Sequence, residues 1–151
     1  MLDKTERNKP KLILLFLICL LLLVINNTVF SLLQFYFSPT SSMGPMRLES
    51  RYFQIVVGCV IGPIIETYIF QSLSTKILGL LRINRFYLLI LIPSLFFAAA
   101  HFYSIIFFLA VFFGGVIINY MYQSYRSSGH YSPFWMTVLL HGLYNAYVFL
   151  V

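Results

Sequence analysis

The sequence predicts an all-α protein whose helices form a bundle across a lipid bilayer. Hydrophobic residues make up 60% of the 151 positions and only 9% are charged, whereas about 25% of residues are charged in a typical soluble domain. The mean hydropathy is +0.88. The apolar residues also gather into runs of roughly 20, the length at which a helix crosses the hydrocarbon core. We expect one domain, because the chain is too short for two.

Five apolar runs are predicted to be membrane helices, and they cover residues 12–37, 52–75, 86–102, 104–123 and 132–151. The first follows a basic tail and has no small-residue cleavage pattern after it, so we expect a retained anchor. A turn-rich loop at 38–51 precedes the second run. A basic link at 76–85 precedes the third, which joins the fourth almost without a loop. A polar turn at 124–131 precedes the fifth.

The net charge of +6 indicates membrane topology and not nucleic-acid binding, because the basic residues lie scattered between apolar runs. With the N-terminus in the cytoplasm, eight basic residues lie inside: Lys4, Arg7, Lys9, Lys11, Lys76, Arg82, Arg85 and Arg126. Arg47 and Arg51 then lie outside. This asymmetry predicts a cytoplasmic N-terminus and an external C-terminus, and we expect a bacterial plasma membrane.

Glu66, His101 and His141 are the only side chains within the apolar bulk that titrate near neutral pH. Ionisable groups inside a membrane are costly and usually functional. Taken singly, Glu66 also suits a protonated structural carboxyl, and each imidazole suits a satisfied core residue. Three such groups on three segments indicate one shared site.

Depth along the helices is a test of that shared site. Glu66 lies ten residues from Lys76 and His101 lies sixteen from Arg85, which places them ~15 Å and ~24 Å from the same face at the helical rise. Convergence therefore requires tilted helices, kinks at proline, or an interfacial basic link.

Short motifs surround the three groups: PIIETYIFQ at 63–71, FAAAH at 97–101 and HGLYN at 141–145. Within them, Thr67 and Gln71 share a helix face, as do His141 and Asn145. A carboxylate can take a proton from water as a general base, and an imidazole can orient that water. Donors from His141 and Asn145 can stabilise the oxyanion formed during amide hydrolysis.

Zinc is an alternative use of the same groups. Two imidazoles and one carboxylate, here His101, His141 and Glu66, can ligate Zn²⁺ and leave a fourth position open. The residues alone leave open whether the site holds zinc or no cofactor.

The three motifs, in this order, resemble those of the CPBP family of intramembrane proteases, the CAAX-protease and bacteriocin-processing group also called Abi. That family has EExxxR, FxxxH and HxxxN on successive membrane helices, and the similarity covers residues 58–151. The resemblance implies that Glu66 activates water and that His101 assists. It also implies that His141 and Asn145 form the oxyanion hole and that Phe97 is the motif aromatic. Family members are often labelled metalloproteases, although a metal-free glutamate mechanism fits at least as well.

Two positions depart from the family pattern: Thr67 stands in place of the second acid and Gln71 in place of the arginine. Losing both charges together avoids an unpaired ion in the membrane, and we expect a hydrogen-bonded Thr–Gln pair instead. The departures weaken the prediction of activity, because the original pair can orient the catalytic acid.

We expect three parts: a cytoplasmic basic tail at 1–11 and a membrane helix with an external loop at 12–57, both from charge and apolar runs, and a protease domain at 58–151, which the resemblance implies. We expect an intramembrane endopeptidase acting on a peptide or protein substrate at the bilayer. The second hypothesis is a non-catalytic adaptor or bacteriocin self-immunity protein on the same scaffold. A proton-relay or transporter subunit is a third, weaker class, since no inverted repeat is present.

The remaining polar and small residues have simpler interpretations. Asn26, Asn27 and Asn119 are interpreted as hydrogen-bond partners between helices, and Gly114-Gly115 as a notch for helix packing. Cys19 and Cys59 both lie in apolar runs and are expected to be free thiols.

Overall fold

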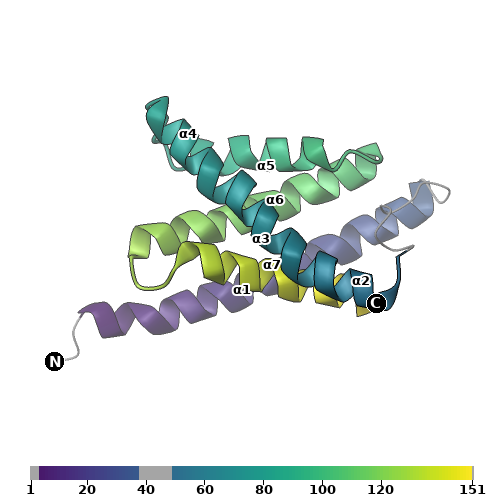
Figure 1. Cartoon of the computed structure of the whole chain (residues 1–151), viewed down its shortest axis with the longest axis horizontal. Coiled ribbons are helices and arrows are strands. Elements are labelled where there is room, and N and C mark those ends of the chain that lie inside the picture. The colour runs from purple at the N-terminus through teal and green to yellow at the C-terminus, as the bar shows by residue number, and fades with distance from the viewer. Residues whose placement is uncertain (1–3, 38–48, 151) are drawn as a thin grey trace.

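The computed structural model describes residues 4–37 and 49–150. These residues form five rod-shaped helices and no strand (Figure 1), which confirms the all-α class. The second rod joins five consecutive helical segments. The elements are α1 (Lys4–Phe37), α2 (Arg51–Phe53), η2 (Gln54–Ile61), α3 (Gly62–Glu66), η3 (Thr67–Leu73), α4 (Ser74–Leu80), α5 (Leu88–Ala100), α6 (Ile105–Ser128) and α7 (Pro133–Leu150).

Several helix ends differ from the predicted boundaries. The first helix begins at Lys4, inside the predicted basic tail, and the second continues to Leu80 instead of ending at 75. The backbone leaves the helix next to Arg82, whose φ is 58°. The fourth helix runs to Ser128, five residues beyond the predicted end, and stops at Gly129, where a φ of 69° is readily adopted by glycine. Most of the predicted loop at 38–51 lies outside the described residues.

The second rod contains two π-helical stretches, η2 and η3, on either side of the short α3 that ends at Glu66. Pro63 contributes to this irregularity because it has no N–H to donate to the Cys59 carbonyl. From residue 54 to residue 75 the buried positions on this rod are four or five residues apart: Gln54, Gly58, Pro63, Thr67, Gln71 and Thr75. The π turns therefore keep one stripe, in which four of the six side chains are polar, facing the bundle over more than twenty residues. π-Helical turns occur frequently at functional sites.

Three of the helical rods are long and apolar enough to cross a bilayer by length and composition: Pro10–Phe37, Arg51–Leu80 and Ile105–Ser128. The apolar α5 has only 13 residues, a rise of ~20 Å against a hydrocarbon thickness of ~30 Å. The 18-residue α7 is also not among the three. Five helices are confirmed, but only three meet this criterion for a span.

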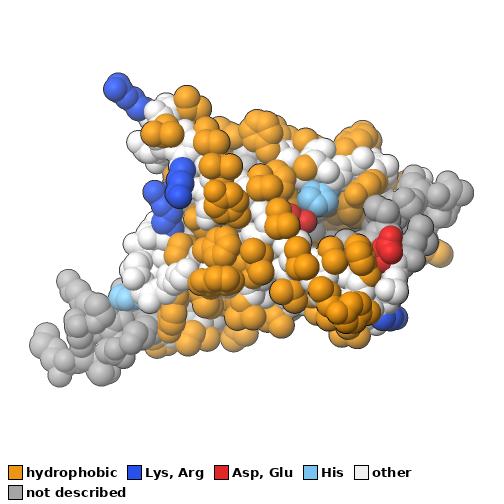
Figure 2. Space-filling model, viewed as in Figure 1, with side chains coloured by type: hydrophobic (Ala, Val, Ile, Leu, Met, Phe, Trp, Pro, Cys, Tyr) orange, Lys and Arg blue, Asp and Glu red, His pale blue; other side chains and the backbone are white. Residues whose placement is uncertain are grey.

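The bundle is apolar outside and partly polar inside. Hydrophobic side chains cover most of the face in Figure 2, while Lys and Arg lie toward its ends. Inside, Gln123 donates to Thr75 Oγ1 at 2.7 Å, and Asn119 donates to Ser94 Oγ at 3.1 Å. Such buried bonds between helices are expected where lipid surrounds the protein, since lipid offers no competing partner.

The helix α6 lies at the centre of the packing and contacts α1, α5 and α7. An apolar cluster joins α1 to α6 and α7, and it contains Leu12, Phe16, Cys19, Leu23, Ile118, Met121, Tyr125 and Leu140. The predicted notch is confirmed at Gly115, where a Cβ atom would lie 3.2 Å from Phe97 and 3.3 Å from Ser94. Both predicted free thiols are confirmed.

Candidate active site

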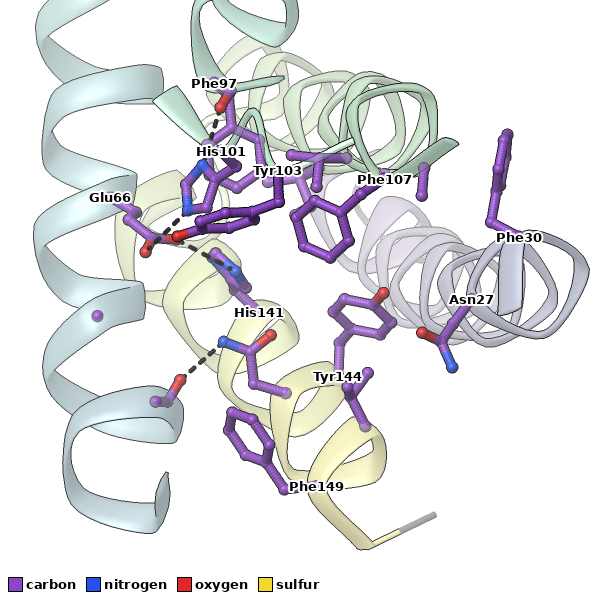
Figure 3. Close-up of a pocket in the computed structure, with 18 of the residues that line it drawn as sticks. Asn27, Phe30, Glu66, Phe97, His101, Tyr103, Phe107, His141, Tyr144 and Phe149 are labelled. Atoms are coloured by element: carbon purple, nitrogen blue, oxygen red, sulfur yellow. Dashed lines mark hydrogen bonds and ion pairs between the residues drawn. The ribbon is translucent and has the colours of Figure 1, made fainter. Parts of the chain in front are cut away.

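The carboxylate of Glu66 lies between the two imidazoles of the predicted site. Glu66 Oε1 is 3.7 Å from His101 Nε2, and Glu66 Oε2 is 3.5 Å from His141 Nε2 (Figure 3). Three residues separated by up to 75 positions in the sequence therefore converge. His141 is nearly buried, with 6% of its side chain exposed, whereas about a quarter of Glu66 and of His101 is exposed.

Glu66 and His101 lie at similar depths, unlike the depths expected from the sequence, because the link between the second and third helices is shorter than predicted. Helix α4 continues to Leu80 and α5 begins at Leu88, so Glu66 is fourteen residues from one helix end and His101 thirteen from the other. These spacings correspond to ~21 Å and ~20 Å at the helical rise. Lys76 lies within the helix and not in the link, which is why a count from the charged residues misplaced the two groups.

His101 is held by the end of its own helix. It follows directly after α5, and its Nδ1 lies 2.9 Å from the carbonyl oxygen of Phe97. A carbonyl only accepts, so Nδ1 carries the proton. In the neutral imidazole, Nε2 is then a lone-pair acceptor directed at Glu66.

His141 and Asn145 lie one turn apart on α7, as the sequence predicted, and both line the site. Asn145 Nδ2 donates to the Gly58 carbonyl at 2.7 Å, which ties α7 to η2. An amide nitrogen carries two hydrogens, so one remains for another acceptor. His141 Nδ1 is buried and has no hydrogen-bond partner within the described residues.

Phe97, the predicted motif aromatic, packs against both imidazoles. Its ring centroid lies 4.7 Å from that of His101 and 5.9 Å from that of His141, the latter edge-on. The ring is itself buried and contacts Phe70 at 5.1 Å. Phe97 thereby restricts the rotation of both histidines.

Thr67 and Gln71 share a buried face, as predicted, but the expected hydrogen bond between them is not formed. Thr67 is 0% exposed and Gln71 is 2% exposed. Thr67 Oγ1 and Gln71 Oε1 each have no hydrogen-bond partner within residues 4–37 and 49–150. The expectation assumed α-helical geometry, whereas both residues lie in the π-helical η3, whose turn is wider.

Two glycines that sequence reasoning did not single out allow α7 to approach the second rod. A Cβ atom at Gly142 would lie 2.5 Å from the Cys59 carbonyl oxygen. A Cβ atom at Gly58 would lie 2.5 Å from the Phe149 ring. The glycine that follows His141 is only a weak sequence signal for such a contact. The need for glycine becomes clear only when the neighbouring backbone at Cys59 is known.

The site opens into a cavity of about 350 Å³ between α1, the second rod, the end of α5, α6 and α7. Glu66, Phe97, His101, His141 and Asn145 all line it. In Figure 3 the cavity extends from Glu66 toward Asn27 on α1. A carboxylate, two imidazoles and an amide thus face a single space that is large enough for a segment of peptide.

The described residues do not present a group of three ligands arranged for zinc. Within the described ranges, no three His, Cys, Asp or Glu side chains form a group that could hold a metal ion. The two imidazoles face different oxygens of Glu66. Zinc at Glu66, His101 and His141 stays a prediction, and the steps proposed below contain no metal.

A family model described as type II CAAX prenyl endopeptidase Rce1-like matches residues 48–147. The chain belongs to this Rce1-like family. The match spans both the Glu66 and the His141 motifs, so the predicted resemblance to CAAX proteases is confirmed. At the level of the family, this Rce1-like chain is a membrane protease of the CAAX type. Comparison with curated proteins and with solved structures gave no match.

Proposed function

We propose that this Rce1-like protein is an intramembrane endopeptidase that hydrolyses a peptide bond with water activated by Glu66. The observation that carries the proposal is the convergence of Glu66, His101 and His141 on one cavity, with contacts of 3.5 and 3.7 Å. The substrate is a peptide or protein segment that reaches the cavity from the bilayer. We further propose that the membrane is a bacterial plasma membrane.

Water attack is the first step. A water beside Glu66 and His101 donates to the carboxylate and to the Nε2 lone pair, whose atoms lie 3.7 Å apart. Glu66 takes the proton as the oxygen of that water adds to the substrate carbonyl carbon. The electron pair of the carbonyl double bond moves to its oxygen, which becomes an oxyanion.

The oxyanion is stabilised by α7. His141, carrying a proton on Nε2, and the second amide hydrogen of Asn145 are the donors, since the first amide hydrogen is held by Gly58. As the tetrahedral intermediate collapses, the C–N bond breaks and the protonated Glu66 returns its proton to the leaving nitrogen. Preorganised donors of this kind contribute ~3–4 kcal/mol each to transition-state stabilisation.

The decisive experiment compares two acids in the chain. Purified protein in lipid nanodiscs is incubated with a peptide library, and products are identified by mass spectrometry. Glu66→Gln keeps the shape of the side chain but removes the base, so we expect at least a hundredfold loss of cleavage. Glu49→Gln changes an exposed acid and should leave cleavage unchanged. No cleavage of any peptide by the wild-type protein would refute the proposal.

A non-catalytic adaptor or self-immunity protein is the second candidate. It is favoured by one observation: Thr67 and Gln71, which replace the charged pair of the family motif, lie buried without the expected hydrogen bond. A protection assay in cells separates the two functions. Full protection by both Glu66→Gln and His101→Ala would support the adaptor, and loss of protection in both would remove it.

A further inference from the structure

The C-terminal half of α1 presents a polar face to the cavity. Asn27, Ser31 and Gln34 line the cavity together with Phe30, and their spacing of three to four residues places them on one side of the helix. Between them, Val29, Leu32 and Leu33 are exposed on the outer surface. The matched family segment begins at residue 48, so this face lies outside it.

The rotation of α1 that creates this face is fixed by contacts on both sides of Asn27. Asn26 Nδ2 donates to the Ala110 carbonyl on α6 at 3.0 Å. A Cβ atom at Gly114 would lie 3.6 Å from the same Asn26 amide, an ordinary contact distance, so this part of α6 lies directly against Asn26. Further along, Gln34 Oε1 accepts from Ser104 at 3.4 Å. These bonds dock α1 on α6 and turn Asn27 and Ser31 toward the cavity.

Asn26 and Asn119 make the hydrogen bonds expected of buried asparagines, but Asn27 does not. The side chains of Asn27 and Ser31 form no hydrogen bond within the described residues, and neither does the Tyr144 hydroxyl. Figure 3 shows Asn27 on α1 and Tyr144 on α7 beside the end of the cavity away from Glu66. All three residues are half-buried and line the cavity, so their polar groups are available to hydrogen-bond a ligand that enters it.

We infer that Asn27, Ser31 and Tyr144 bind the main chain of an extended peptide whose scissile bond lies at Glu66. This inference rests on the proposed function. One asparagine amide offers a donor and an acceptor, which matches the N–H and C=O of a peptide unit. A lipid acyl chain has no group to satisfy this polar wall, so a peptide is the ligand that fits.

The distance from the reacting groups sets the position of this subsite. Tyr144 follows His141 by three residues on α7, a rise of ~4.5 Å. An extended chain advances ~3.3 Å per residue. By this measure Tyr144 contacts a substrate residue one or two positions from the scissile bond, and Asn27 on α1 lies at the end of the cavity away from Glu66 (Figure 3).

Steady-state kinetics on a peptide that the wild-type protein cleaves test the subsite. Asn27→Leu keeps the approximate size and suits the membrane, and we expect a three- to tenfold rise in KM, with kcat within twofold, from loss of one or two hydrogen bonds. Asn27→Gln should restore part of the affinity. Thr28→Val is the matched control, because Thr28 is exposed and bonds only the Val24 carbonyl of its own helix. An unchanged KM in Asn27→Leu would overturn the inference while leaving the proposed function intact.

A second measurement detects binding without turnover. In the Glu66→Gln protein, p-benzoylphenylalanine is placed at position 27 or at position 28, and the labelled peptide library is the probe. Cross-linking from position 27 and not from 28 would support the subsite, even if the wild-type protein cleaved nothing. Equal cross-linking from both positions, or cross-linking to lipid alone, would overturn it.

Discussion

At the scale of single residues, Thr67 and Gln71 lie at the two positions where the family pattern has a charged pair. Both side chains are buried and neutral, with Thr67 next to Glu66 in the chain. A single substitution would introduce a charge at one position and leave the other position neutral, so the new charge would lack its partner. Two charges introduced together could still pair across the wider turn of η3, because the side chains of Glu and Arg are longer than those of Thr and Gln and opposite charges attract over a longer distance than a hydrogen bond spans.

This reasoning predicts a strong coupling between the two positions. Thr67→Glu or Gln71→Arg alone should destabilise the protein by roughly 3 kcal/mol or more, because an unpaired buried charge is costly. The double variant Thr67→Glu/Gln71→Arg should recover at least half of the summed loss. Unfolding in mixed micelles, followed by circular dichroism, measures all four proteins of the cycle. A double variant as unstable as the sum of the single variants would contradict the prediction.

At the scale of elements, the site depends on how closely α7 approaches the second rod. The hydrogen bond from Asn145 to Gly58 and the contact of Gly142 with Cys59 occur at this interface. His141 precedes Gly142 in the chain, so a shift of α7 moves an imidazole away from Glu66. The π-helical η2 supplies both Gly58 and Cys59.

Adding one methyl group at Gly142 should push α7 away from the second rod. Gly142→Ala places a Cβ atom 2.5 Å from a backbone oxygen, so α7 must shift, and we expect a loss of roughly 1–3 kcal/mol of stability together with reduced peptidase activity. Gly79→Ala is the matched control, because a Cβ atom there meets nothing within 4 Å. The control should be neutral, or more stable by up to about 1 kcal/mol. Thermal unfolding in nanodiscs measures both, and equal melting temperatures for the two variants would refute the prediction.

At the scale of the whole molecule, charged and apolar side chains occupy different parts of the surface. Large hydrophobic side chains are exposed around the bundle, while the Lys and Arg side chains visible on the face in Figure 2 lie toward its ends. This arrangement suits a protein surrounded by lipid, because the charged side chains reach the aqueous boundaries.

The charge asymmetry of the sequence predicts the orientation of the whole chain. With eight basic residues against two, we expect the N-terminus in the cytoplasm and the C-terminus outside. Alkaline phosphatase fused after Leu150 should be active, and green fluorescent protein fused there should be dark. Fusions after Arg82, in the link on the cytoplasmic side, should give the reverse. A fluorescent fusion after Leu150 with an inactive phosphatase would show the opposite topology.

The sequence by itself determined the membrane class, the five helices, and the chemical groups of the site. Composition and apolar runs are properties of local sequence, and so are the motifs that carry Glu66, His101, His141 and Asn145. Each could therefore be predicted without knowing which helices are neighbours. The helix ends were less certain, because a turn such as that at Gly129 depends on the backbone angle adopted there.

Only the tertiary structure decided how these groups meet. The convergence on Glu66, the π-helical turns beside it, and the approach allowed by Gly142 all depend on how each helix is rotated and crossed against its neighbours. Asn26 and Asn27 are adjacent and chemically identical, yet one docks α1 on α6 and the other faces the cavity. Helix rotation is set by packing between distant segments, and a single sequence does not state which segments pack together.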